Sequence, residues 1–250
     1  MKTEKELLNF LKHGDREYLS NITIDCVIFG YHEQQLKILL GRWKGLNGLG
    51  LPGGFIKKNE PIGQAALRIL KEKTGLDDVY LEQFHVFGDT PYRVNNNTLH
   101  PSVAKSWLAG RSISVGYYAL VEFSKVTLEP DIFIDAYEWH DVEGLPPLLF
   151  DHDDTITTAL HHLRINLYHR PIGYNLLEKK FTLPEIQFLY ETLLKRKLDR
   201  RNFPRKLISL GLIKDTNEVR KIGQHRSPRL YSFDKKNYNK ALKEGIVWAI

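Results

Sequence analysis

The chain has 250 residues, a formal net charge of +6 and a single cysteine, Cys26. This length exceeds the roughly 100–200 residues of a typical domain, so we expect two domains. The sequence lacks both the ~18-residue apolar run of a membrane span and the apolar segment of a secretory signal, and one cysteine excludes an internal disulfide, so we expect a cytoplasmic protein without a membrane partner.

The charge is unevenly distributed along the chain. Residues 1–170 carry 18 Lys and Arg against 22 Asp and Glu, a net of −4, whereas residues 171–250 carry 18 against 8, a net of +10. A small domain with such a surplus attracts polyanions, because binding releases their counterions. Solvated lysines can also serve solubility alone, so charge by itself leaves nucleic-acid binding open.

The amino-terminal part of the chain alternates short apolar segments with one strongly patterned helix. We expect a helix over residues 3–13, and strands over residues 22–29, 36–40, 80–88, 114–123 and 135–140. A glycine-rich loop is expected over residues 44–54, and a helix over 62–74 that stops at Gly75, a residue suited to a left-handed cap. This order indicates a mixed α+β sandwich.

Residues 54–76 carry the pattern on which most of the interpretation depends. Seven positions match the Nudix box of a family of metal-dependent hydrolases, and the segment resembles that box: Gly54, Glu60, Arg68, Leu70, Glu72, Gly75 and Leu76. The resemblance implies a Nudix-like α/β/α sandwich.

Two carboxylate positions of the box are missing. Ile69 and Lys73 stand where the family carries acids, and positions 69, 72 and 73 share one face of a helix. Mg²⁺ needs well-placed carboxylate oxygens, and here Glu72 remains beside an ammonium group. We therefore expect no catalytic residues, no metal site and no cofactor. The alternative is a Mg²⁺-dependent hydrolase of a nucleoside-diphosphate derivative that uses Glu72, Glu60 and acids elsewhere.

Two segments lie between the box and the carboxy-terminal part. Residues 90–109 form a long polar stretch with an exposed-looking Trp107, which suits a binding loop and a disordered insertion equally. A helix is expected over residues 154–168, where His161 and His162 are assigned a structural or solvent role. Pro171 ends this helix and marks a domain boundary.

The basic carboxy-terminal part has the pattern of a helix-turn-helix. Thr182 and Glu185 form a capping box before a first helix, and Asp199 offers a cap for a second helix over residues 200–210, which tolerates Pro204 only near its start. The outward face of the second helix carries side chains of the kind that bond base edges and phosphates: Arg200, Arg201, Asn202, Arg205 and Lys206.

A basic hairpin is expected to follow as a wing. Its strands lie at residues 212–213 and 229–233, and its candidate DNA-binding residues are Arg220, Lys221, His225, Arg226 and Arg229. The charges of a single basic helix often serve solubility alone, but the helix pair and the basic hairpin together favour DNA binding.

Nearly the whole chain resembles the Nudix-related transcriptional regulators, which join a Nudix-like sensor to a winged helix-turn-helix. The specific segments are residues 150–152, 171–177, 181–183, 198–203 and 227–231. The resemblance implies a homodimer on a palindromic operator of double-stranded DNA, with an effector of the sugar or nucleotide-sugar class. ADP-ribose and L-arabinose are the known classes, and segments 150–152 and 171–177 favour a pentose and a role in carbohydrate metabolism.

The expected organisation is a sensing domain over residues 1–150, a linker helix over 151–170 and a DNA-binding domain over 171–250. Candidate effector-binding residues are Trp43, Arg68, Glu72 and Arg111. For Arg68 and Glu72 an ion pair that ties helix to loop is an equally open interpretation. Besides a regulator and a hydrolase, a metabolite-binding dimer whose basic tail binds RNA, or nothing, remains a third reading.

Overall fold

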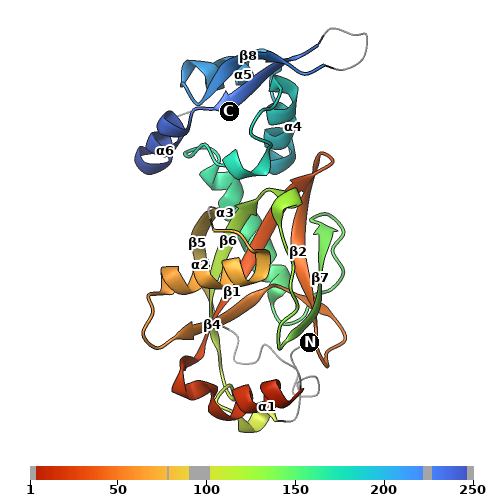
Figure 1. Ribbon diagram of the computed structural model, residues 1–250, viewed down its shortest axis with the longest axis vertical. Coiled ribbons are helices and arrows are strands. Elements are labelled where there is room, and N and C mark those ends of the chain that lie inside the picture. The colour runs from red at the N-terminus through yellow and green to blue at the C-terminus, as the bar shows by residue number, and fades with distance from the viewer. Residues whose placement is uncertain (1–3, 78, 90–101, 222–226, 247–250) are drawn as a thin grey trace. The chain divides into compact units, whose positions relative to one another are not determined.

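The computed structural model describes residues 4–77, 79–89, 102–221 and 227–246 (Figure 1). The chain divides into two compact units, the first made of residues 1–30 and 37–160 and the second of residues 31–36 and 161–250. Each unit is described separately. Much of the predicted 90–109 loop and part of the predicted wing lie outside the described residues.

The first unit is built around a mixed seven-stranded sheet with a main strand order β3-β2-β1-β6-β5. Strands β1 and β6 pair in parallel, whereas β4 pairs antiparallel with β1 and β7 antiparallel with β2. The strands are β1 (Tyr18–His32), β2 (Gln35–Trp43), β3 (Leu49–Gly50), β4 (Gly53–Lys57), β5 (Tyr80–Phe87), β6 (Ile113–Val121) and β7 (Ile134–Asp141). The central strands β1 and β6 are buried along most of their length, which explains their continuous apolar runs.

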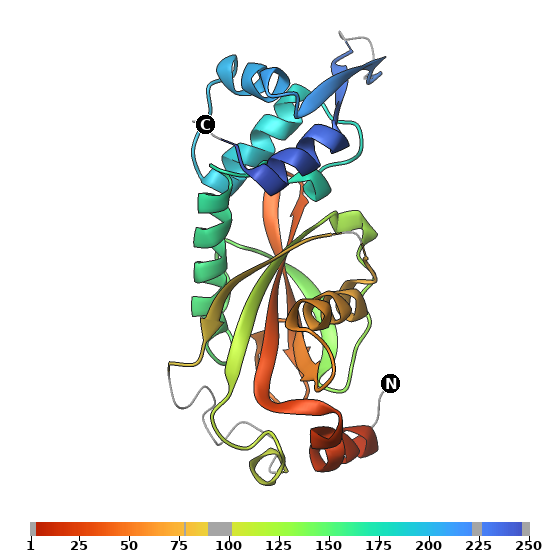
Figure 2. The same cartoon turned by 90° about the vertical axis from the view of Figure 1, so that its left-hand side faces the viewer.

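Helices cover both faces of this sheet. Helix α2 (Ile62–Thr74) and the first part of α3 (His152–Asn166) lie on opposite sides of it (Figure 2), and α1 (Glu4–His13) precedes the sheet. Gly75 ends α2 in the left-handed region, with φ of 73°. The Ile69 side chain is buried in the core, and a Cβ on Gly54 would lie 2.9 Å from Ile69 Cγ1. The first glycine of the box thus makes room for the isoleucine that replaces a carboxylate.

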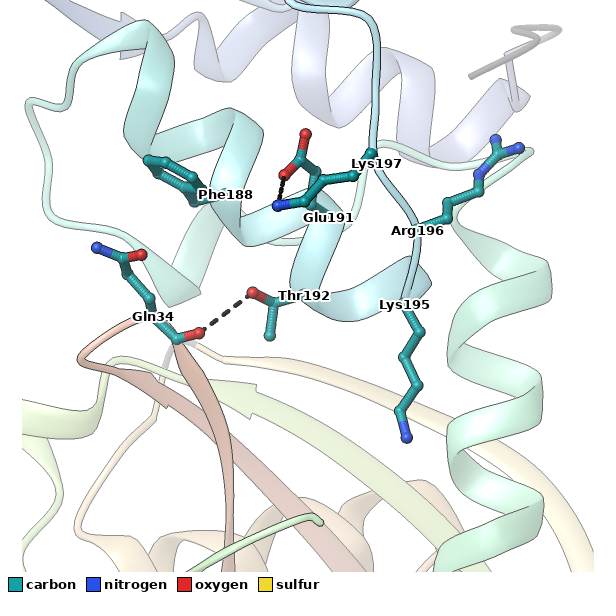
Figure 3. Close-up of a pocket in the computed structure, with 7 residues that line it drawn as sticks. All are labelled: Gln34, Phe188, Glu191, Thr192, Lys195, Arg196 and Lys197. Atoms are coloured by element: carbon teal, nitrogen blue, oxygen red, sulfur yellow. Dashed lines mark hydrogen bonds and ion pairs between the residues drawn. The ribbon is translucent and has the colours of Figure 1, made fainter.

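The second unit is a small helical domain with a two-stranded antiparallel sheet. Its elements are α4 (Leu183–Leu194), α5 (Asn202–Ser209), β8 (Ile213–Val219), β9 (Arg229–Phe233) and α6 (Lys235–Glu244). The predicted capping box at Thr182 and Glu185 is formed, and the apolar side chains Ile186, Leu189, Leu193 and Leu194 of α4 are buried. At the end of α4, Glu191 accepts a hydrogen bond from Lys197 Nζ at 3.0 Å (Figure 3).

The structure corrects several predicted elements. Residues 44–54 are not a continuous loop, because β3 and the start of β4 lie within them. Trp107 is half-buried, since its Nε1 donates to the Phe10 carbonyl at 2.9 Å. Helix α5 begins at Asn202, which places Pro204 in its first turn, where no helical hydrogen bond is lost. Leu210, the last residue of the predicted second helix, lies after the end of α5 and is 37% exposed.

Helix α6 was not predicted from the sequence, although Asp234 accepts from the Asn237 backbone as its cap. Among the described residues, no helix is both long and apolar enough to span a membrane.

Candidate functional site

A cavity of about 470 Å³ lies in the first unit, next to α2. Its aromatic wall comes from six side chains: Phe10, Tyr18, Trp43, Phe55, Phe133 and Phe150. Its charged and histidine side chains are Asp25, Lys44, Arg68, Glu72, Lys73, Asp131, Asp151 and His152. This volume falls within the roughly 300–1,000 Å³ that small-molecule sites occupy, and a mainly aromatic wall with a few polar groups is typical of them.

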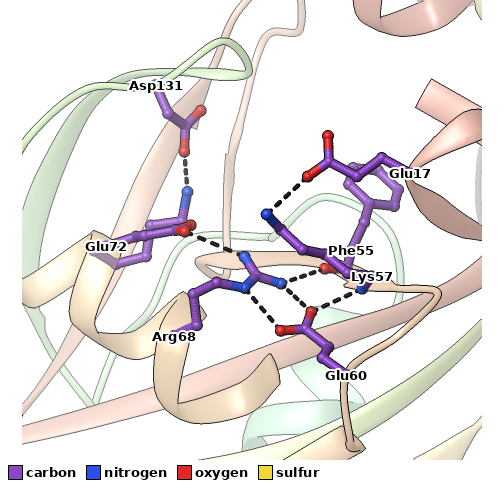
Figure 4. Close-up of polar contacts among 8 residues, drawn as sticks. Glu17, Phe55, Lys57, Glu60, Arg68, Glu72 and Asp131 are labelled. Carbon is purple, nitrogen blue, oxygen red and sulfur yellow. Dashed lines mark hydrogen bonds and ion pairs between the residues drawn. The ribbon is translucent and has the colours of Figure 1, made fainter. Parts of the chain in front are cut away.

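The Arg68 side chain occupies one edge of the cavity and holds the box segment together (Figure 4). Its guanidinium donates to Glu60 Oε2 at 3.1 Å, to the Phe55 carbonyl at 2.9 Å and to Glu72 Oε1 at 3.2 Å. Hydrogen bonds from Arg68 lower the pKa of Glu60 despite its partial burial. Both candidate residues Arg68 and Glu72 therefore line the cavity. They pair with each other within α2, whereas the ion pair that ties the helix to the preceding loop joins Arg68 to Glu60.

Lys73 lies deeper, at the position where the box carries its last glutamate. Its ammonium group is ion-paired with the Asp131 carboxylate, and the two side chains are 10% and 16% exposed. Asp131 also accepts from the backbone of Phe133 at 2.7 Å and of Ile134 at 2.9 Å. Burial raises the pKa of Asp131, but the Lys73 charge and these hydrogen bonds outweigh it and hold the pKa below its ordinary value.

Asp25 and His152 form a second polar cluster in the cavity. The Leu51 backbone N–H donates to His152 Nδ1 at 2.8 Å, so a neutral imidazole carries its proton on Nε2. That atom lies 3.9 Å from Asp25 Oδ2, and Ser114 Oγ donates to the same carboxylate oxygen. His152 is 3% exposed, so the cluster is a fixed polar surface within the cavity.

Trp43 Nε1 and Asn21 Oδ1 are buried atoms of cavity residues that have no hydrogen-bond partner among the described residues. Buried polar atoms are nearly always satisfied, so each calls for a water molecule or a ligand group. Trp43 packs against Phe150 with ring centroids 5.1 Å apart, which holds the indole in place.

Three of the four predicted effector residues, Trp43, Arg68 and Glu72, meet in this cavity. Arg111 is not among the lining residues, because its guanidinium turns to the Gly88 carbonyl, to which Nε donates at 2.9 Å. Sequence reasoning missed Asp25 and Asp131. Asp25 is a lone acid within an apolar strand, a signal that could have marked it, whereas Asp131 carries no such signal.

The second unit presents a separate basic surface at the start of α5, where Arg200 and Arg201, predicted to be helical, directly precede the helix. Phe203 and Leu207 are buried, and the predicted contact residues Arg200, Arg201, Asn202 and Arg205 are exposed, while Lys206 is half-buried. Asp199 accepts from the backbone of Arg201 at 3.0 Å and of Asn202 at 2.7 Å, which anchors the helix start. An exposed helix with this composition suits the major groove of a duplex.

The hairpin β8–β9 places two of its predicted contact residues in ion pairs. Arg220 pairs with Glu185 of the capping box, and Arg229 Nη1 lies 2.8 Å from Asp215 Oδ2. Lys221 is exposed. The other two candidates, His225 and Arg226, lie outside the described residues.

The fold and the two sites define a Nudix domain joined to a winged-helix domain. Comparison with known proteins agrees with this class. Residues 20–160 match the family described as NUDIX domain, and residues 173–233 match the NrtR DNA-binding winged helix domain. The predicted α/β/α sandwich and winged helix-turn-helix are thereby confirmed.

Relatives of known function share this organisation. The ADPR responsive transcriptional repressor NtrR of Acinetobacter baylyi is 31% identical over 87% of this chain and 84% of its own length. The crystal structure of Shewanella oneidensis NrtR complexed with a 27mer DNA is similar, with a TM-score of 0.70 and 30% identity over 87% of this chain and 95% of that one. Shewanella oneidensis NrtR alone gives a TM-score of 0.71, with 29% identity over 87% and 96%.

The chain belongs to the family of Nudix-related transcriptional regulators of the NrtR type.

Proposed function

We propose that this protein is a transcriptional regulator that binds double-stranded DNA, and that its affinity for DNA changes when a small molecule occupies the Nudix cavity. The observation that carries the proposal is the Lys73–Asp131 ion pair inside that cavity. It leaves a ligand-sized cavity whose box positions do not fit Mg²⁺: Ile69 is buried in the core, and Glu72 bonds Arg68. Among the described residues, no three His, Cys, Asp or Glu side chains are grouped to hold a metal.

The DNA-binding half of the proposal is supported by α5 and by the Shewanella relative. That relative was crystallised with a 27mer DNA, and here the corresponding unit exposes Arg205 on α5 and Arg200 and Arg201 directly before it. We propose that α5 reads the major groove and that the basic hairpin touches the backbone, in a homodimer on a palindromic operator. The functional division is a sensing part over residues 1–150, a linker over 151–170 and a DNA-binding part over 171–250.

The effector proposed first is ADP-ribose. The Acinetobacter relative is named for its response to ADPR, and a cavity of about 470 Å³ is larger than a single pentose requires. The aromatic wall formed by Phe10, Tyr18 and Phe55 suits a planar base.

A pentose is the second candidate, and the charges of the cavity favour it. Lining carboxylates number four, at Asp25, Glu72, Asp131 and Asp151, against the three cations Lys44, Arg68 and Lys73. Each of these cations already bonds a protein oxygen. A diphosphate would compete for these cations, whereas an uncharged sugar would use Asp25 and His152 as hydrogen-bonding groups and Trp43 as a stacking surface.

Two measurements test these proposals. Fluorescence anisotropy with DNA from upstream of the protein's own gene should show binding that ADP-ribose or L-arabinose weakens or strengthens, and calorimetry should identify which compound binds. Incubation with ADP-ribose and Mg²⁺ should leave the nucleotide intact. Turnover at enzymic rates would establish the hydrolase alternative, and binding of RNA but no duplex would support the third reading.

A further inference from the structure

Two elements that carry cavity side chains continue into the second unit. Strand β1 places Asp25 in the cavity, and its last residues and the turn after them, residues 31–36, belong to the second unit. Helix α3 places His152, its first residue, in the cavity, and from His161 onward it too belongs to the second unit. Because His152 Nε2 lies 3.9 Å from Asp25 Oδ2, a ligand that touches this pair acts on both elements at once.

The other ends of β1 and α3 contact adjacent residues of α4. Thr192 Oγ1 donates to the Gln34 carbonyl at 3.2 Å (Figure 3), and the Thr192 side chain also hydrogen-bonds Tyr31. From α3, Arg164 Nε donates to the Leu193 carbonyl at 3.0 Å. The last four carbonyls of a helix have no partner within it, so Arg164 supplies the one that Leu193 lacks.

The last turn of α4 is in turn fixed to the residue that leads into α5. Glu191 Oε1 accepts from the Leu198 backbone N–H at 3.0 Å, and Gln187 Nε2 donates to the Leu198 carbonyl at 3.1 Å. Glu191 and Gln187 are each 9% exposed, so these bonds are shielded from water. Leu198 directly precedes Asp199, whose carboxylate anchors the start of α5.

We propose that Thr192 and Arg164 couple the cavity to α5, because β1 and α3 each run from a residue of the Asp25–His152 pair toward the segment that contacts α4. Regular strands and helices move as bodies, so a shift at either cavity residue is carried to the far end of its element. Two hydrogen bonds at neighbouring residues, Thr192 and Leu193, attach the end of α4 to the Gln34 turn and to α3. The inference deepens the proposed function and rests on it.

The first test compares the full-length protein with its Thr192→Val/Arg164→Met variant. Effector coupling in such systems changes affinity by about 5- to 150-fold, and we expect a change of that size in the DNA Kd of the wild type on adding ADP-ribose. In the variant, adding ADP-ribose should change the DNA Kd by less than about twofold. The ADP-ribose Kd from calorimetry should stay within about twofold of the wild-type value, because neither residue lines the cavity. An unchanged response of the variant would overturn the inference.

A second test needs no effector, so the failure of the inference and the failure of the proposed function remain distinguishable. Amide hydrogen exchange of residues 189–198 is measured in Asp25→Asn, with His152→Asn as an independent perturbation of the same pair. Either substitution should change protection there in an otherwise wild-type chain, but not in the Thr192→Val/Arg164→Met background. Thr157→Val, an exposed position of α3, is the matched control and should leave the transmission intact. Unaltered exchange at residues 189–198 in both cavity variants would refute the coupling, whichever ligand the cavity binds.

Discussion

The Lys73 ammonium is ion-paired with the Asp131 carboxylate across 58 positions of sequence, inside the cavity beside α2. Lys73 stands at the box position where hydrolases carry a glutamate, and its charge neutralises the Asp131 carboxylate that lines the cavity. The stability, the metal response and the acid sensitivity of the first unit should all depend on this pair.

Lys73→Met should lower the free energy of unfolding by about 3–5 kcal/mol, because it leaves the mostly buried Asp131 carboxylate without its ion-pair partner. Urea denaturation measures this loss. Lys71→Met is the matched control on the same helix: its partner Asp77 is 70% exposed and Lys71 itself 60%, so the loss should be about 0–1 kcal/mol. Adding Asp131→Asn to Lys73→Met should recover part of the stability, and equal losses at positions 71 and 73 would contradict this account.

Lys73→Glu should create a response to Mg²⁺ that the wild type lacks. The substitution places a second carboxylate beside Asp131, so the Tm should fall without metal, and Mg²⁺ should restore part of it by binding the folded form. Thermal denaturation with and without Mg²⁺ gives both values. A wild-type Tm that itself rises with Mg²⁺ would show that the box still binds a divalent ion.

Acid should remove the contribution of Asp131 to stability. Its pKa is lowered in the fold, so the unfolded chain takes up the proton first as pH falls; the contribution is complete above the unfolded pKa of about 3.9 and is lost as pH drops through the folded pKa. The difference in unfolding free energy between wild type and Asp131→Asn should be largest near neutral pH and shrink below about pH 4. A difference independent of pH would exclude this role for the carboxylate.

Arg201 and Arg220 should affect DNA binding in different ways. Arg201 is exposed directly before α5, and if it neutralises a phosphate, Arg201→Ala should reduce the slope of log Kd against log salt by about 0.9. Arg220 is ion-paired with Glu185, so Arg220→Met should lower the Tm and weaken binding while leaving that slope nearly unchanged.

Lys236→Ala serves as the control for both arginines. Lys236 is an exposed residue of α6, so this substitution also removes one positive charge, but outside α5 and the hairpin. A loss of slope in Arg220→Met equal to that in Arg201→Ala would show that Arg220 contacts DNA directly.

Local sequence patterns were enough to predict most helices and strands, whereas the composition of the cavity depends on contacts between residues far apart in the sequence. Both ends of helix α2 could be predicted, because the signals that define them, the apolar spacing and the glycine cap at Gly75, are local in the sequence. The partner of Lys73 could not be predicted from the sequence, because no pattern near Asp131 distinguishes this acid from the other acids of the chain. Helix α6 escaped prediction since only Tyr238 and Ala241 of its ten residues are buried, which leaves a weak apolar stripe.

The ion pair inside the cavity also determines what the proposed sensor would measure. A Nudix enzyme needs its substrate and a divalent ion together, so its output follows the product of two concentrations. Here Lys73 supplies a permanent counter-ion as part of the chain. Occupancy would then follow the organic ligand alone, and swings in free magnesium would leave gene expression undisturbed.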